Sequence, residues 1–516
     1  MADNSSGNKR IARNTAFLYI RMAFVMLITL YTSRVILQSL GVVDFGIYNV
    51  VAGFVSMFSF LNTSLIACIQ RYYNYEQGKN GVEGFKNVYV TSFYIQLALA
   101  LLVFVAIESF GIWYLENKLV IPSDRLPAAH ILFQASALSL LLVIVQVPYS
   151  AAIIAREKMD YYAFVGIADI LLKLIIVFAL AWTTIFDKLA LYGILLFIVT
   201  IIDFLLYYVY AKRKIPEIRL SLHFDFGLFK SMMKFSGWSM LGSFAQIVRN
   251  QGLNILLNLF FGPAVNAARG ISYQVRTAIS SFMANVPTAA RPQLIESYAK
   301  GDYRRAKQIM FTISKICFML IYIVALPVIF EMDFLLHLWL GDSVPEYTTI
   351  FSRIIVVIAI IEALNWPVSM IIYASGKIGW YNVVTSIVGL LVLPLCYVSL
   401  IIDVNPILVY IISLLISISV QVVSVFCMKK VVNIGVYDYT KNVITPSCIV
   451  VLLTVCVPLL LTIFMQDGFI RLVMVCIVSV LWTLSICYLV GMSNNEKQLV
   501  RMYVSNFTKR IRKNHE

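Results

Sequence analysis

Long apolar runs recur along the whole chain, and short polar segments separate them. Many runs hold twenty or more predominantly apolar residues, which is enough for an α-helix to cross the hydrocarbon core of a bilayer. The pattern therefore predicts an all-α polytopic membrane protein with about fourteen spans. Their approximate ranges are 14–38, 45–70, 87–114, 129–155, 161–185, 189–211, 236–260, 264–290, 307–330, 350–374, 380–402, 405–428, 442–464 and 469–491.

The composition fits this picture. Of 516 residues, 60% are apolar and only 13% are charged, whereas about a quarter of the residues of a soluble domain are charged. Eight cysteines lie within or at the ends of the runs without CxxC spacing, and four histidines lack metal-ligand spacing. Neither a disulfide framework nor a metal site is predicted. No small-residue cleavage site follows the first run, which is expected to be retained as a span.

Lys and Arg gather in alternate connections between the runs, including AKRKIPEIR, YAKGDYRRAK and the tail TKRIRKNHE. The other connections hold only four basic residues, Lys118, Arg125, Lys188 and Arg471. Basic residues are retained on the cytoplasmic side of a membrane, so both termini are predicted to be cytoplasmic. The same rule accounts for the net charge of +15, which therefore gives no reason to expect nucleic-acid binding.

An internal repeat divides the chain. The segment VPYSAAIIAREKMDYYAFV (147–165) aligns without gaps on WPVSMIIYASGKIGWYNVV (366–384), with Pro148 opposite Pro367 and Tyr162 opposite Tyr381. The shift equals six spans, an even number, so the two halves have the same orientation in the membrane. We predict an N-lobe at 1–215 with spans one to six and a C-lobe at 222–430 with spans seven to twelve. Two extra helices at 436–491 and a basic cytoplasmic tail at 492–516 follow.

Several spans carry polar side chains at helical spacing. A stripe on the eighth span consists of Asn266, Arg269, Tyr273, Arg276 and Ser280. The seventh span carries Arg249, Asn250, Asn254 and Asn258, and the first carries Arg21. The embedded acids are fewer: Glu108, Asp169, Asp203 and Glu362. A charge that faces lipid costs roughly 2.5–3.5 kcal/mol, so these groups are expected to face a cavity.

The excess of embedded bases predicts a cationic lumen for an anionic substrate. Arginine suits phosphate in particular, because its planar fork bonds two oxygens at once. The predicted substrate-binding residues are Arg21, Arg249, Arg269, Arg276, Asn250, Asn254 and Tyr273. Asp203 and Glu362 are candidates for coupling transport to H⁺ or Na⁺, and each can instead neutralise an arginine. Other interpretations stay open: arginines can snorkel to headgroups, the asparagines can hold helices together, and Asp169 can pair with Lys173.

The chain has no GxxxxGK[ST] phosphate loop and no soluble domain large enough for a separate enzyme. Hydrolysis of ATP by that route is therefore excluded, and no cofactor is predicted. The connections lack the His or paired-acid clusters expected of a membrane glycosyltransferase or ligase. These observations favour a transporter over an enzyme.

The stretch TSRVILQSLGVVDFGIYNVVAGFVSMFSFLN (32–62) resembles the opening of Wzx-type polysaccharide flippases, which read approximately S-x-x-L-G-x-x-x-F-G-x-Y. The matching positions are Ser39 (loosely aligned), Leu40, Gly41, Phe45, Gly46 and Tyr48. The segment RYYNYEQGK and the paired Pro-containing hairpins also look typical of that family. The resemblance covers residues 10–490, and outside the opening motif it is carried by topology and repeat.

The resemblance implies a member of the superfamily that includes multidrug/toxin extruders (MATE) and the lipid II flippase, the MOP exporters. It implies alternating-access flipping of undecaprenyl-pyrophosphate-linked oligosaccharide across the bacterial inner membrane for a surface polysaccharide such as lipopolysaccharide. Membrane lipids and other polysaccharide-assembly proteins are the implied partners. Many relatives have twelve spans, and fourteen is closer to lipid II flippases.

A MATE-like drug/cation antiporter and a membrane polysaccharide polymerase or ligase are the alternatives. The arginine excess and the short outer loops, respectively, argue against them.

Overall fold

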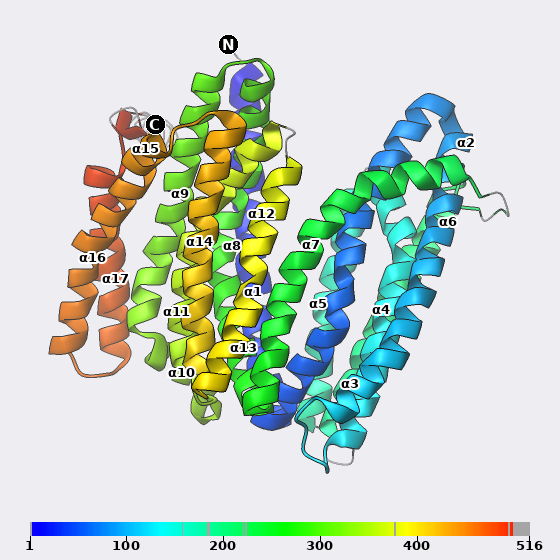
Figure 1. Ribbon diagram of the computed structural model, residues 1–516, viewed down its shortest axis with the longest axis horizontal. Helices are drawn as coiled ribbons and strands as arrows, with labels where there is room; N and C mark the ends of the chain where they lie inside the picture. The colour runs from blue at the N-terminus through cyan, green and yellow to red at the C-terminus, as the bar shows by residue number, and fades with distance from the viewer. Residues whose placement is uncertain are drawn as a thin grey trace, which may run out of the picture. The chain divides into compact units, whose positions relative to one another are not determined.

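The computed structural model describes residues 3–156, 158–182, 186–219, 221, 224–375, 378–493 and 496–498, which form helices and short turns without a strand (Figure 1). The α-helices are α1 (Asp3–Ser56), α2 (Phe60–Ala106), α3 (Ile112–Asn117), α4 (Leu126–Ala155), α5 (Met159–Trp182), α6 (Lys188–Lys214), α7 (Phe226–Phe261), α8 (Pro263–Ala299), α9 (Tyr303–Phe330), α10 (Met332–Leu340), α11 (Thr348–Ala374), α12 (Ile378–Leu390), α13 (Val392–Ile402), α14 (Pro406–Val432), α15 (Val436–Tyr439), α16 (Thr445–Phe464) and α17 (Phe469–Ile486). Short 3₁₀ and π segments are η1 (Met57–Ser59), η2 (Ile107–Gly111), η3 (Gly341–Ser343), η4 (Thr440–Ile444) and η5 (Cys487–Gly491).

The helices confirm the predicted fold class of an all-α, multi-pass membrane protein. In the described part of the chain, 11 helical segments are long and apolar enough to cross a membrane. Helices α7 and α8 are also long, and they carry the polar residues on which the predicted site depends. In the described part of the chain, each of the fourteen predicted ranges is predominantly helical, and several of them cross from one helical element into the next.

Glycines end or break helices at matching places in the two halves. Gly41 interrupts α1 with φ 78° and ψ 171°, and Gly262 separates α7 from α8 with φ 75° and ψ −172°. Gly81 within α2 and Gly301 between α8 and α9 also have positive φ. A side chain is strained in this region of φ, which is why glycine is found at these turns. The members of each pair are separated by nearly the same number of residues as the two Pro-containing segments, so the backbone supports the internal repeat.

The described chain forms two compact units. The first comprises residues 1–270, 342–346 and 393–406, and the second comprises 271–341, 347–392 and 407–516. Helix α7 belongs to the first unit in this structure, because it packs against α2 and α1. Packing units and sequence repeats are different divisions, and the lobe boundaries at 1–215 and 222–430 stay a prediction.

In the first unit, α4 packs along both α2 and α6, while α5 packs on α6 and α1 (Figure 1). The apolar core has two parts. One is centred on Ile47, Phe54 and Phe133, and the other on Tyr73, Phe85 and Ile153. In Figure 1, α2, α4 and α6 run side by side, which agrees with these contacts.

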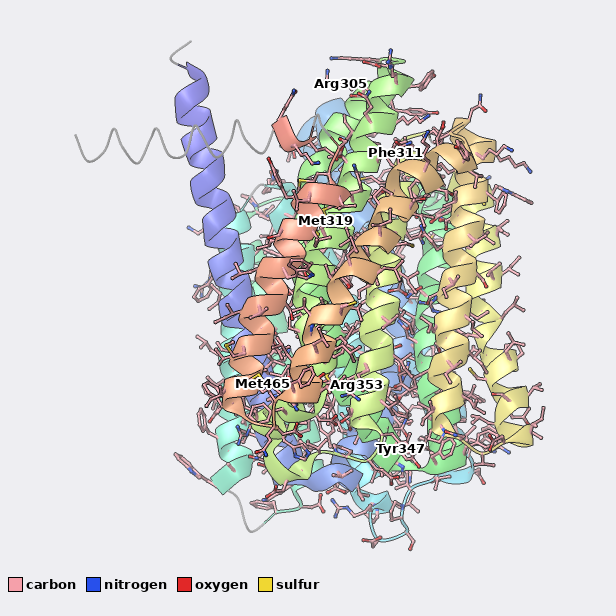
Figure 2. All side chains as sticks on the ribbon, turned by 90° about the vertical axis from the view of Figure 1, so that its left-hand side faces the viewer. Arg305, Phe311, Met319, Tyr347, Arg353 and Met465 are labelled. Atoms are coloured by element: carbon pink, nitrogen blue, oxygen red, sulfur yellow. The ribbon has the colours of Figure 1, made fainter. Side chains whose placement is uncertain are left out.

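In the second unit, α9 packs against α11, α16 and α17. Their shared apolar core contains Phe318, Tyr322 and Val450. Figure 2 shows Arg305 and Met319 in succession along α9, with Met465, between α16 and α17, toward the opposite end of the unit. The C-terminal helix pair is thus attached to the unit along the length of α9.

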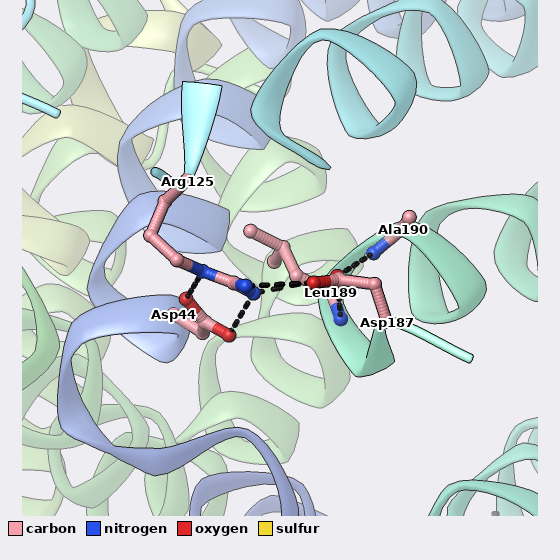
Figure 3. A network of polar contacts seen from close by, with 5 residues as sticks. All are labelled: Asp44, Arg125, Asp187, Leu189 and Ala190. Atoms are coloured by element: carbon pink, nitrogen blue, oxygen red, sulfur yellow. Dashed lines mark hydrogen bonds and ion pairs between the residues drawn. The ribbon is translucent and has the colours of Figure 1, made fainter. Parts of the chain in front are cut away.

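An ionic network joins three helices of the first unit (Figure 3). Arg125, at the start of α4, donates from Nε to Asp44 of α1 at 2.7 Å and pairs with it a second time through Nη2. Its Nη1 donates to Asp187 at 2.6 Å. Asp187 also caps α6, since its Oδ1 accepts from the backbone N–H groups of Leu189 and Ala190 at 3.0 Å. One arginine therefore fastens α4 to both α1 and α6.

Lowering the pH is expected to weaken the contact between Asp187 and Arg125 in this network. Burial opposes ionisation of Asp187, but the Ala190 N–H and the Arg125 guanidinium outweigh burial and hold its pKa below the ordinary 3.8. A lowered pKa contributes stability above the ordinary value, and this stability is lost as the pH falls through the folded-state value. The contribution of such a half-exposed pair is at most about 1 kcal/mol. Thermal unfolding of the detergent-solubilised protein between about pH 6 and pH 3 measures this loss of stability.

Asp187→Asn provides the matched control for this prediction. Asparagine caps a helix about as well as aspartate, but it cannot pair with Arg125 as an anion. The variant is expected to lose less stability than wild type over the same pH range. An equal loss in the two proteins would assign the acid sensitivity to other carboxylates.

Candidate functional site

Arg269 joins the two polar helices of the predicted site. Its side chain lies on α8, is 5% exposed and donates from Nη2 to the backbone carbonyl of Asn250 on α7 at 2.8 Å. Asn250 is thus brought beside Arg269 through its main chain. Because the guanidinium is buried against a neighbouring helix, Arg269 contributes to helix packing in this conformation.

The asparagine stripe is used for contacts between helices. Asn254 donates from Nδ2 to the Asn49 carbonyl of α1 at 2.9 Å. Asn266 donates from Nδ2 to both the backbone and the side-chain oxygen of Asn254, each at 2.7 Å. Asn258 accepts from the backbone N–H of Val120 at 2.9 Å. These bonds agree with the interpretation that the asparagines hold helices together.

Arg276 forms an ion pair with Glu362, which joins α8 to α11 within the second unit. The two side chains are 20% and 25% exposed, so the pair is accessible at its edge. The Tyr273 ring lies one turn away on α8, with its centroid 5.5 Å from Arg276 Cζ, a distance suited to a cation–π contact. The geometry fits the expectation that Glu362 neutralises an arginine, and it brings Arg276 and Tyr273 together.

The other two predicted basic residues are Arg249 and Arg21. Arg249 is half-buried on α7, next to Asn250 and in the first unit. Arg21 lies in α1, and its side chain is outside the described part of the structure. Among the described residues, no group of three or more His, Cys, Asp or Glu side chains is arranged to hold a metal ion.

Asp203 has acidic and basic neighbours on the adjacent helix. It lies on α6 near Asp169 and Lys173 of α5, and those two residues form an ion pair at 2.8 Å. Asp203 Oδ1 is buried without a hydrogen-bond partner. Asp203 thus has a lysine and a second carboxylate as neighbours, and one of its oxygens is left available to a proton or cation.

Sequence reasoning missed an aromatic extension of the site on α11. Trp366, Ser369 and Tyr373 follow Glu362 at spacings of four, three and four residues, so they share one helical face. Trp366 is 50% exposed, and the Tyr373 hydroxyl donates to Asn382 Oδ1 at 3.2 Å. The spacing of these residues is visible in the sequence ALNWPVSMIIYA. What the sequence does not show is that this face of α11 lies near the arginines, because that follows only from the position of Glu362 beside Arg276.

Comparison with protein-family models gives no match, and no curated protein matches the sequence. Solved structures do match. The chain is similar to a MATE family transporter of the MOP superfamily in an inward-facing conformation, with a TM-score of 0.66 and 13% identity over 80% of this chain and 98% of that one. It is also similar to the lipid II flippase MurJ in an inward closed conformation, with a TM-score of 0.70 and 13% identity over 92% of this chain and 99% of that one.

A eukaryotic MATE transporter matches with a TM-score of 0.52 and 14% identity over 82% of this chain and 98% of that one. The chain has the fold of MOP superfamily transporters. At these identities the likeness is one of architecture, and function has to be argued from the side chains. The MurJ match extends over a larger share of this MOP-fold chain than either MATE match.

Proposed function

We propose that this protein is a flippase that moves undecaprenyl-pyrophosphate-linked oligosaccharide across the bacterial inner membrane by alternating access. The observation that carries the proposal is the placement of Arg249, Arg269 and Arg276 on two consecutive long helices, α7 and α8, which the hydropathy pattern predicts as spans seven and eight. Arg276 is the best candidate for contact with substrate, because it is partly exposed and flanked by Tyr273. An embedded arginine with accessible surface suits an anionic headgroup.

Each part of the substrate corresponds to a chemical feature of the chain. The guanidinium of Arg276 offers paired N–H donors to pyrophosphate oxygens. Trp366, Tyr373 and Tyr273 offer apolar ring faces with a polar edge, which suit the mixed surface of a sugar. Asn250 and Asn254 donate or accept hydrogen bonds with hydroxyl groups, and Asn254 exchanges its present bonds when the helices rearrange. The polyprenyl tail remains among the membrane lipids.

The MATE-like antiporter is the second candidate function. Asp203, with its buried oxygen and its Asp169–Lys173 neighbours, is the observation that favours it, since cation exchange needs an embedded acid. The partly exposed Arg276 favours an anionic substrate over a cationic drug. Both functions place the chain in the inner membrane with cytoplasmic termini. Under the flippase proposal, other polysaccharide-assembly proteins supply and consume the substrate.

Reconstitution distinguishes the two functions. Purified full-length protein is placed in liposomes that contain a fluorescent undecaprenyl-pyrophosphate oligosaccharide, and a membrane-impermeant quencher reports the outer-leaflet fraction with time. Protein-dependent flipping under a voltage, a proton gradient or a sodium gradient is the expected result. Absence of flipping under all three, together with efflux of a cationic dye, would establish the antiporter instead.

Asp203 is the proposed coupling residue. If H⁺ drives flipping through this acid, Asp203→Asn removes the response to a pH gradient, because an amide does not bind and release the proton. A gradient of one pH unit supplies about 1.4 kcal/mol. The comparison variant is Glu108→Gln, which replaces another embedded acid of the same unit; its Oε2 accepts from Gln134 at 3.1 Å, and its Oε1, like Asp203 Oδ1, is buried without a hydrogen-bond partner. Flipping rates with and without the gradient provide the measurement, and an unchanged response in Asp203→Asn would remove the assignment.

A further inference from the structure

Two ion pairs of the second unit differ sharply in accessibility. Glu331 and Arg471 are 0% and 10% exposed, and two hydrogen bonds of 2.9 and 3.0 Å link them. Arg276 and Glu362 are 20% and 25% exposed, and Arg276 Nη2 pairs with Glu362 Oε2. The buried Glu331 carboxylate leaves little room for another ligand, whereas a pair in which both partners are partly exposed can be approached by one. Arg276 is therefore accessible to a competing anion.

The face around this pair is polar and aromatic. Tyr273 flanks Arg276 on α8, and Trp366 follows Glu362 by one turn on α11 with half of its surface exposed. Helix α11 is long and apolar enough to cross a membrane, and the Arg276–Glu362 pair joins α8 to it. Turning an arginine and a glutamate toward lipid is costly. The face is thus suited to a polar ligand, and the Glu362 carboxylate is an anion already bound to Arg276.

We propose that the Glu362 carboxylate is a resident anion, which occupies the anion site of Arg276 until the phosphate of the substrate displaces it. This inference rests on the proposed flippase function and adds a mechanism by which the substrate is released from Arg276. A phosphate group offers the guanidinium more oxygens and more charge than a carboxylate, so it displaces Glu362 on binding. When the substrate leaves, Glu362 returns to Arg276. Its return competes with rebinding and so promotes release.

Competition predicts a specific pattern of affinities. In Glu362→Gln the amide is uncharged, so an anionic ligand no longer has to displace a charged competitor. The affinity for the ligand is expected to rise by roughly two- to fivefold, the range that corresponds to a partly exposed ion pair. Arg276→Gln is expected to bind the ligand more weakly than wild type. Glu362→Gln combined with Arg276→Gln is expected to bind no better than Arg276→Gln alone, because under this inference Glu362 competes with the ligand for Arg276.

The test measures binding of farnesyl pyrophosphate, a short polyprenyl pyrophosphate, to the full-length protein in detergent by isothermal titration calorimetry at fixed pH and salt. The matched control is Asp333→Asn, which also removes one negative charge from the second unit and releases Arg353, its 2.9 Å partner. Asp333→Asn is expected to bind as wild type does. Glu362→Asp, which retains the charge on a shorter side chain, is expected to lie between wild type and Glu362→Gln and provides a second variant if the first fails to fold.

Three results overturn the inference. Affinity that is unchanged or reduced in Glu362→Gln, while Arg276→Gln still weakens binding, would make Glu362 a structural partner and leave the flippase proposal intact. An equal gain in Asp333→Asn would assign the effect to net charge. Absence of binding to wild type and to every variant would remove the anion site itself and, with it, the present form of the proposed function.

Discussion

Replacement of Arg276 by Gln is expected to reduce flipping at subsaturating substrate by roughly tenfold to a hundredfold. Hydrogen bonds to charged groups contribute about 1.5–3 kcal/mol, and each 1.4 kcal/mol corresponds to about a factor of ten. Glutamine keeps a polar side chain of similar length but loses both the charge and the paired donors. Arg276→Lys is expected to retain part of the rate, because it keeps the charge without the planar fork.

Two assays measure this effect: flipping in liposomes, and restoration of surface glycan in a flippase-deficient host at matched membrane levels. Arg353→Gln is the matched control. Arg353 is also an arginine of the second unit paired with a carboxylate, but its partner Asp333 is 59% exposed. Wild-type rates in Arg276→Gln would show that Arg276 serves only to join α8 to α11.

Loss of the Glu331 charge is expected to have the largest effect on stability. Glu331 is fully buried between α9 and α10 and accepts two hydrogen bonds from Arg471 of α17. Glu331→Gln leaves a buried guanidinium without its main counter-charge, which typically costs about 3–5 kcal/mol. The midpoint of thermal unfolding in detergent, followed by size-exclusion chromatography, is expected to fall by several degrees or more.

The same arginine provides the control for this prediction. Arg471 also contacts Asp467, whose side chain is 82% exposed. Asp467→Asn is expected to cost less than about 1 kcal/mol, because water screens that contact. Glu331→Gln combined with Arg471→Gln is expected to recover part of the lost stability, since no uncompensated charge remains. Equal shifts in the two single variants would contradict the prediction.

The fold could be predicted in detail because the same sequence pattern recurs at every span. Each span needs a long apolar run, and each boundary is marked by polar or basic residues, so hydropathy alone locates α4, α6 and α9 closely. The Pro-containing repeat predicted two halves of equal orientation, and the glycine turns at Gly41 and Gly262 support it. The lengths of α1 and α8 were less predictable. A single glycine with positive φ, Gly41, turns the chain after the first span, and the helix continues directly beyond it.

The hydrogen-bond and ion-pair partners of the polar side chains in the site could not be predicted from their spacing in the sequence. The Asn254 and Asn258 stripe was visible in the sequence, but whether it bonds ligand or helix depends on neighbours such as Asn49 and Val120, which are far away in the chain. The same limit applies to Arg269, whose acceptor is a backbone carbonyl that every helix contains. Glu362 was predicted as a coupling acid or as a partner of an unspecified arginine, and only three-dimensional packing identifies Arg276.

The attachment of the C-terminal helices to α9 has a practical consequence for spectroscopy. Beside the Glu331–Arg471 pair at one end, Lys307 pairs with Asp438 and Lys315 with Glu496 toward the other. With ionic links at both ends and an apolar core between them, α9 and the C-terminal helices α16 and α17 are expected to move together. The distance between two spin labels, one on α9 and one on α17, is therefore expected to stay constant during a transport cycle. It provides an internal reference for larger distance changes measured elsewhere in the protein.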